Sequence, residues 1–336
     1  MDTKTLFRER PLAKPLIVGG LVIAALLLEG AACQQGGAAA ETAASPRYDA
    51  SYRARWRDGK AELAGYALRY PRYGELRRGT AVMITVTEPF DPDSGVKPER
   101  AGKGHVQAIK LNLAQDFGTG VYDYNMMTTA IVATEPLFGR TAGSTAKVSF
   151  GSQEWCGHVY AQLRFGKAGV QMTSHSYFEG EADQSRALPH PAGGHDEDSL
   201  PLWARGLAAP MLQPGQALRV PLLSSLVRSR LQHVQLSWQQ AVLTRHAGVE
   251  QVTVPAGSFE VERMTAEIDY KHGEGRVWTF LVERAQPRRI IAFERDDGLS
   301  AKLLGDKRLA YWKLQKEGHE RHLKELGLSP RGPAMP

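Results

Sequence analysis

The 336-residue chain has little cysteine, no apolar run of membrane-spanning length and no dense run of basic residues. Its two cysteines are Cys33 and Cys156, so at most one disulfide can form within the chain. The longest apolar run, Leu16 to Leu28, has 13 residues, fewer than the about 20 that a spanning helix needs. The net charge of +6 is spread along the sequence, which argues against a nucleic-acid-binding stripe. We therefore expect a soluble body that does not bind nucleic acid.

Motifs of the common enzyme classes are also missing. The sequence has no P-loop, no His-Glu-x-x-His and no Gly-x-Ser-x-Gly elbow. Asp116-Phe117-Gly118 matches a kinase tripeptide, but neither a Gly-rich phosphate loop nor a His-Arg-Asp loop accompanies it. Trp155-Cys156-Gly157-His158 is similar to a thioredoxin-type redox centre, but Val159 stands where dithiol exchange needs a second cysteine. We therefore expect a protein that is not an enzyme.

The N-terminus has the pattern of a secretory signal peptide. Lys4, Arg8, Arg10 and Lys14 precede the apolar run, and Gly30-Ala31-Ala32 follows it. A basic start, a short apolar centre and a small-residue end are typical of a cleaved signal, not of a spanning helix. We predict that residues 1–32 are a lipoprotein signal peptide.

Cys33, directly after small residues, resembles the lipidation site (lipobox) of bacterial lipoproteins. This resemblance implies that Cys33 carries acyl chains that hold the protein on a membrane, and that Cys156 has no disulfide partner. Gly30 stands where the family usually has Leu, so ordinary cleavage to a secreted or soluble periplasmic protein stays open, while length disfavours an uncleaved anchor. Gln34, where Asp favours inner-membrane retention in such lipoproteins, implies the outer membrane of a Gram-negative host.

Beyond the signal, the sequence indicates a tether and then β structure. Short alternating runs bounded by Gly, Pro and charge recur with no long helix between them, which favours an antiparallel sheet. We predict a mainly β fold with one extended curved, half-barrel-like antiparallel sheet, in one or two lobes, and a C-terminal helix. The expected parts are the signal peptide (1–32), a flexible tether (33–47), an N-terminal antiparallel β lobe (48–182), a linker-like loop (183–199), a C-terminal half-barrel-like β lobe (200–306), a helix (307–326) and a disordered tail (327–336).

The C-terminal part resembles a family of periplasmic proteins of unknown function that share the half-open barrel of lipoprotein carriers. The motifs are VTVPAGSFEVER at 252–263 and GRVWTFLVERAQPRRIIAF at 275–293, within residues 200–304. The resemblance implies a concave apolar face that holds acyl chains or docks a partner. The candidate lining residues are Phe259, Val261, Trp278, Phe280 and Ile291, for which the alternative is ordinary core packing.

A hairpin at 155–178 offers an alternative of another class. If Gly166-Lys167 is a two-residue turn, His158 faces His175 and Cys156 faces Tyr177. Two imidazoles and a thiol on one face can bind Zn²⁺ or Cu ions, although such pairs are also ordinary packing. This alternative is a metal-binding protein or metal-dependent enzyme centred on Cys156, His158 and His175; no cofactor is favoured.

A second group of metal-ligating side chains lies in the Pro/Gly-rich stretch HPAGGHDED, at His190, His195, Asp196, Glu197 and Asp198. Such charged residues in a linker are usually solvated.

The favoured hypothesis for the whole chain is a membrane-anchored, non-enzymatic lipoprotein on the periplasmic face of the outer membrane. It binds an apolar ligand or an envelope protein on its curved sheet; a structural subunit without a small ligand is a third alternative.

Overall fold

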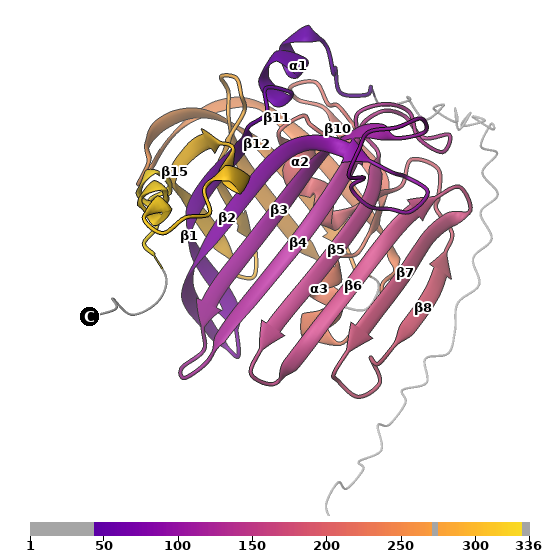
Figure 1. The fold of residues 1–336 in the computed structure, drawn as a ribbon, viewed down its shortest axis with the longest axis horizontal. Coiled ribbons are helices and arrows are strands. Elements are labelled where there is room, and N and C mark those ends of the chain that lie inside the picture. Colours follow the sequence, from indigo (N-terminus) through magenta and orange to yellow (C-terminus); the bar gives the residue numbers. More distant parts are fainter. Residues whose placement is uncertain (1–43, 271–274, 331–336) are drawn as a thin grey trace, which may run out of the picture. The chain divides into compact units, whose positions relative to one another are not determined.

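One curved sheet of 15 strands forms the described part of the chain (Figure 1). The structure is a computed structural model that describes residues 44–270 and 275–330. Cys33, the signal peptide, most of the tether and the end of the tail lie outside the described residues. The first strands are β1 (Ala61–Arg72), β2 (Glu75–Phe90), β3 (Val106–Gly118), β4 (Asp123–Ala133), β5 (Thr145–Glu154), β6 (Gly157–Gly166), β7 (Gly169–Ser176) and β8 (Gln184–Leu188).

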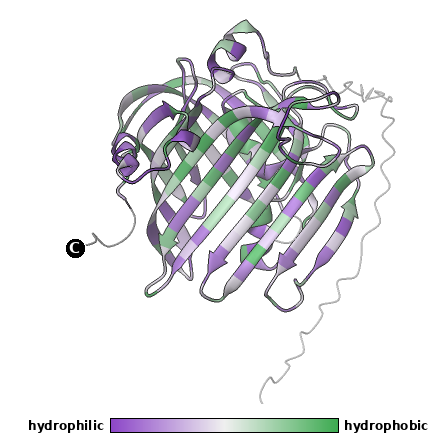
Figure 2. Ribbon diagram, in the orientation of Figure 1, coloured by the Kyte–Doolittle hydropathy of each residue, from purple (hydrophilic) through white to green (hydrophobic). Residues whose placement is uncertain are grey.

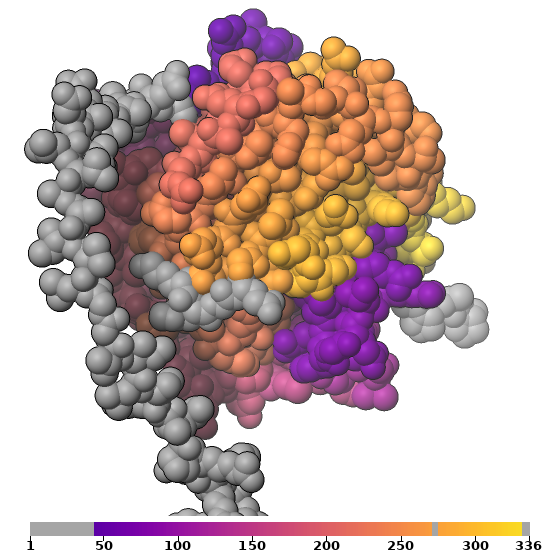
Figure 3. Space-filling model, turned by 180° about the vertical axis from the view of Figure 1, so that it is seen from behind, coloured from indigo at the N-terminus to yellow at the C-terminus, as the bar shows by residue number. Residues whose placement is uncertain are grey.

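The C-terminal strands continue the same sheet. They are β9 (His195–Asp196), β10 (Ala217–Leu223), β11 (Trp238–Val254), β12 (Gly257–Asp269), β13 (Arg276–Glu283), β14 (Ile290–Arg295) and β15 (Ser300–Leu309). Figure 3 shows from behind the surface that β11 to β15 form, in orange and yellow. The helices are α1 (Ala50–Trp56), α2 (Leu200–Ala204) and α3 (Leu226–Gln232), with 3₁₀ helices η1 (Glu197–Ser199), η2 (Tyr311–Lys313) and η3 (His319–Leu326).

The pairing of β1 with β15 joins the two halves of the chain into one sheet. These strands run antiparallel, from Ala61 opposite Leu309 to Arg69 opposite Ser300. The strand order is therefore β8 to β1, then β15 back to β9. Among the described strands, only β9 and β10 pair in parallel. The expected mainly β fold with a curved antiparallel sheet is confirmed, and the 15 strands belong to one sheet.

Alternating side chains explain why these residues form strands. In β5, Val148 and Phe150 point into the core while Lys147 and Ser149 lie on the other face. Figure 2 shows apolar and polar residues alternating along the strands in this way. One face of the sheet can therefore be buried while the other stays in water.

The concave side of the sheet is filled by the segment that follows β9. Leu200, Leu202 and Trp203, of α2, are almost wholly buried, and so is Leu226 at the start of α3. All four belong to one apolar cluster with strand residues from both halves of the chain. The segment expected as a linker-like loop (183–199) thus contains β8, β9 and η1 and leads directly into the core.

The chain end differs from the expected helix over 307–326. There, β15 runs to Leu309, and helical structure is confined to η2 and η3. The eight residues of η3 lie against the outside of β1 and β15, with Leu326 buried beside Ala61, Leu63 and Val86. Strand pairing with β1 outcompetes the helical pattern of residues 307–309 because it adds a row of hydrogen bonds.

Candidate functional site

The five predicted lining residues do not surround one cavity. Trp278 and Phe280 stack with ring centroids 5.8 Å apart and line a cavity of about 50 Å³. Val261 and Ile291 are fully buried in the core, and Phe259 is partly buried beneath Arg289. A volume of about 50 Å³ admits a few water molecules but not an acyl chain. Around Trp278 and Phe280, the concave side is therefore filled by side chains and leaves no room for an acyl chain.

The acidic stretch expected to be solvated is part of this core. Glu197 accepts hydrogen bonds from Ser225 N (2.9 Å), Tyr270 Oη (2.7 Å) and Trp278 Nε1 (2.9 Å). Asp198 accepts from Leu226 N at 3.0 Å. These bonds fix the start of α3 to β12 and β13, which explains why charged residues stand in the interior.

The neighbouring titratable groups are perturbed by burial. Burial raises the pKa of Asp198 well above its usual value, and nearby Asp196 and Glu197 raise it further, although Leu226 N–H lowers it. Burial also raises the pKa of Asp196, against the hydrogen bonds from Thr145 and Ser199. Burial lowers the pKa of His195 to about 4, so this imidazole is neutral at neutral pH.

The proposed metal hairpin forms with a different register. Its turn is Lys167-Ala168 rather than Gly166-Lys167, so Tyr160, not His158, faces His175. Because the shift is two residues, His158 and His175 keep their predicted face, whereas Cys156 lies in the turn between β5 and β6. His175 bonds instead to Asp183 (2.8 Å), and Cys156 is exposed. Over residues 44–270 and 275–330, no three His, Cys, Asp or Glu side chains come together as metal ligands.

A much larger hollow, not indicated by any motif, is lined in part by residues of α1. This cationic cleft has a volume of about 820 Å³. Its walls are residues 44–56, the end of α2 with the loop after it (203–213), the middle of β11 and β12, and the β13–β14 hairpin (284–288). Figure 1 shows α1 beyond one end of the curved sheet. Asp49 caps α1 by accepting from Ser51 N and Tyr52 N, and Trp56 fastens the helix to the core.

Glu62, the second residue of strand β1, binds two arginines of this cleft. Its carboxylate lies 2.7 Å from both Arg55 Nη2 and Arg205 Nη2, and its side chain is 3% exposed. Burial alone would raise the pKa of Glu62, but the two guanidinium groups lower it overall. Both guanidinium groups also lie over the ring of Trp56, at 5.5 and 5.4 Å.

Glu262, on β12, repeats the arrangement on the other wall. Its carboxylate accepts hydrogen bonds from Arg245 Nη2 and Arg288 Nη1, both at 2.9 Å. Against the effect of burial, these two partners lower the pKa of Glu262. Each carboxylate is thus shared by two arginines, so each group carries one positive charge in excess.

The cleft is consequently cationic. Among its described lining residues, the acids are Asp49 and Glu262, and an excess of three positive charges remains even when Glu62 is counted. The basic lining residues are Arg47, Arg55, Arg205, Arg245, Arg284 and Arg288. They are scattered over 242 sequence positions, so no local charge run could have indicated the site. Clustered guanidinium groups suit phosphate and carboxylate ligands.

Comparison with protein-family models gives no match, and comparison with curated proteins gives none either. The fold is similar to the crystal structure of a beta-barrel-like protein of domain of unknown function DUF1849 from Brucella abortus. That similarity has a TM-score of 0.43 and 9% sequence identity, and it covers 74% of this chain and 97% of the other. None of the described helices is both long and apolar enough to cross a bilayer. The chain is a mainly β protein built on one large curved antiparallel sheet.

Proposed function

We propose that this protein is a non-enzymatic, membrane-anchored protein of the cell envelope whose cationic cleft binds phosphate groups at the membrane surface. The observation that carries the proposal is the sharing of Glu62 and of Glu262 by two arginines each. A structural ion pair needs one cation for each carboxylate. The uncompensated charge lies beside an open cleft. Arg205 is 5% exposed and donates to carbonyl oxygens of the β13–β14 hairpin, but Arg55 and Arg284 are 32% and 58% exposed and can reach an anionic partner.

The place of the cleft along the chain supports a membrane partner. Ala44, on the cleft wall, pairs with Met211 of the same wall. Ala44 lies eleven positions after Cys33, a distance of at most about 40 Å when the chain is fully extended. If Cys33 carries the predicted lipid, the cleft stays within that reach of the bilayer. The favoured location remains the periplasmic face of the outer membrane.

Vesicle binding tests this proposal. The full chain carrying Cys33→Ser, so that no acyl chain contributes, is mixed with phosphatidylcholine vesicles with or without phosphatidylglycerol. We expect binding to the vesicles that contain phosphatidylglycerol and not to the others, because each arginine near an anionic surface contributes about 1 kcal/mol to the binding free energy. Arg47→Gln with Arg284→Gln removes two exposed cleft charges and should weaken binding at least about tenfold.

A matched control is Arg78→Gln. Arg78 is exposed on β2, at the end remote from Thr85, the residue that pairs with Glu62. This variant should bind like the parent chain. Equal losses in the cleft variant and the control would show general surface attraction and contradict the proposal. Competition by inorganic phosphate separates a phosphate site from a site that needs the whole lipid.

A further inference from the structure

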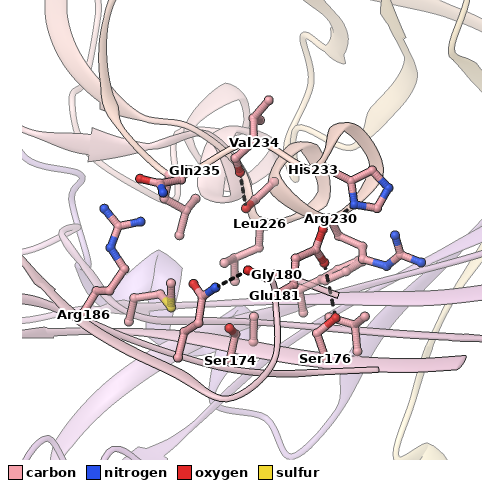
Figure 4. A pocket seen from close by; sticks show the side chains of 17 residues that line it. Ser174, Ser176, Gly180, Glu181, Arg186, Leu226, Arg230, His233, Val234 and Gln235 are labelled. Atoms are coloured by element: carbon pink, nitrogen blue, oxygen red, sulfur yellow. Dashed lines mark hydrogen bonds and ion pairs between the residues drawn. The ribbon is translucent and has the colours of Figure 1, made fainter. Parts of the chain in front are cut away.

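A second pocket lies at the seam where the curved sheet ends. The seam separates edge strand β8 from the segment that leads from α3 to β11. At one end it is closed by Trp238, whose Nε1 donates to Pro189 O at 2.8 Å. At the other end, His233 Nδ1 contacts Glu181 Oε1. Between the Trp238–Pro189 hydrogen bond and the His233–Glu181 contact lies a partly open pocket of about 190 Å³, which we call the seam pocket (Figure 4).

The floor of the seam pocket is apolar. It is made of side chains from the inner face of β5, β6 and β7 and from the α3 segment, all largely buried. They are Phe150, Val159, Ala161, Met172, Leu226 and Leu236. A floor of this kind favours the hydrocarbon part of a ligand.

The charged groups around the floor are paired, with one exception. Arg230, stacked 3.8 Å from the centre of the Phe178 ring, binds Glu154 at 2.6 Å. Glu181 contacts His233 and accepts from Ser176 Oγ at 3.3 Å. Arg186 has no hydrogen-bond or ionic partner among the described residues, although its side chain is half-buried in the pocket wall.

The register of the sheet explains why Arg186 points inward. It lies opposite Met172 on β7, and both side chains face the concave side. In Figure 4, Arg186 rises from the sheet toward the wall that carries Val234 and Gln235. No nitrogen of Arg186 is both buried and without a partner, so this guanidinium reaches solvent beside the apolar floor and can pair with an anionic group that enters the pocket from water.

We propose that the seam pocket binds a small monocarboxylate with a short apolar tail. The carboxylate pairs with the Arg186 guanidinium, and the tail lies on Met172 and Leu236. The pocket is smaller than drug-sized sites, so a tail of about four to six carbons suits its volume. This site is separate from the cationic cleft, which is lined by other residues, and its failure would leave the cleft untouched.

Hexanoate titrated into the full chain tests the site by calorimetry and by the ¹³C-methyl signals of methionine. We expect saturable binding, with a shift of Met172 and none of Met127, which is half-exposed elsewhere. Arg186→Gln should weaken hexanoate binding by about tenfold or more, because charge-assisted hydrogen bonds are lost. Hexanol and hexylamine, which lack the carboxylate, should bind at least about tenfold more weakly than hexanoate.

Arg219→Gln is the matched control. Arg219 is an exposed arginine of β10 that lines none of the hollows described above, and this variant should keep the parent affinity. Absence of hexanoate binding, or an unchanged affinity in Arg186→Gln, overturns the proposal. Equal affinity for hexanol overturns it too, since the apolar floor alone would then account for binding.

Discussion

The indole Nε1 of Trp278 donates a hydrogen bond of 2.9 Å to Oε1 of Glu197, 81 residues earlier in the chain. One partner belongs to a strand expected to line a ligand face, and the other to a stretch expected to be solvated. Their contact joins both segments in the buried interior, because Glu197 also accepts from Tyr270 and from Ser225, the N-cap residue of α3. The interior is therefore held by polar bonds at its centre and by apolar packing around them.

Glu197→Gln should destabilise the fold. A carboxylate accepts from all three donors, whereas a glutamine amide presents one oxygen and an NH₂ group, so at least one buried donor loses its partner. We expect the free energy of unfolding to fall by about 1–3 kcal/mol. Urea denaturation followed by circular dichroism measures the change. Glu179→Gln, at an exposed position, should leave the midpoint unchanged, and equal midpoints for both variants would refute the buried role of Glu197.

Asp198→Asn should stabilise the fold at neutral pH. The pKa of Asp198 is raised in the folded state, so the folded chain binds its proton more tightly than the unfolded chain does. Stability is therefore lost as the pH rises from about 4 through the folded pKa. Asparagine still accepts from Leu226 N without this loss. We expect a gain of about 1 kcal/mol near pH 7.5 that disappears below about pH 4.

The comparison for this pH effect is Asp269→Asn. Asp269 is exposed at the end of β12, so its replacement should shift the unfolding free energy little at any pH. Thermal and urea unfolding across the pH range give the two profiles. If the unfolding free energies of the parent chain and of Asp198→Asn changed with pH in the same way, the raised pKa of a buried Asp198 carboxyl would be contradicted.

Local sequence pattern predicted the strands because alternation is a property of neighbouring residues. Val159, Ala161, Leu163 and Phe165 all face the core as their period-2 spacing indicates. The pairing of β1 with β15 could not be read in this way, because Ala61 and Leu309 lie 248 residues apart. The turn between β6 and β7 could not be predicted in this way either. Gly166 and Gly169 form the last pair before it, and an error of one residue in the position of the turn moves the cross-strand partner of every residue by two.

The candidate sites were harder to predict for a physical reason. A buried carboxylate such as Glu62 is tolerated only with partners, and its partners Arg55 and Arg205 come from α1 and from the loop after α2. The same holds for Glu197 with Trp278. From sequence alone a charged residue is assigned to the surface, because a partner that is distant in the chain is not visible. Sequence analysis therefore misses buried carboxylates such as Glu62 and Glu197.

Glu262→Gln should affect binding and stability in opposite directions. Loss of the carboxylate shared by Arg245 and Arg288 raises the charge of the cleft by one. Affinity for phosphatidylglycerol vesicles should then rise by about fivefold, while the free energy of unfolding falls by about 2 kcal/mol. Vesicle sedimentation and urea denaturation measure the two effects. Glu267→Gln, on the same strand but exposed, should change neither; weaker vesicle binding by Glu262→Gln would count against the cleft.

Mass spectrometry of the mature N-terminus tests the anchor. We expect the chain to begin at Cys33 with acyl chains attached, and Cys33→Ser to move the protein from the membrane to the soluble fraction. A lipid-free terminus at an alanine or at Gln34 would remove the anchor from the proposed function. It would leave the cleft as a phosphate site of a soluble periplasmic protein.

Gly65→Ala should release the C-terminal segment from the sheet. Gly65 and Gly305 pair across β1 and β15, and the backbone of η3 lies directly on them. A Cβ at position 65 would overlap the carbonyl oxygen of Leu326 and lie 3.2 Å from its carbonyl carbon.

Because backbone cannot rotate away as a side chain can, we expect a loss of about 1–3 kcal/mol in the stability of this contact. Hydrogen exchange should accelerate at Gly327 and Leu328, whose amides close the end of η3. Gly151→Ala is the control: a Cβ there meets nothing nearer than 3.9 Å. Unchanged exchange in Gly65→Ala would mean that the sheet, and not the last turn, gives way to accommodate the methyl group.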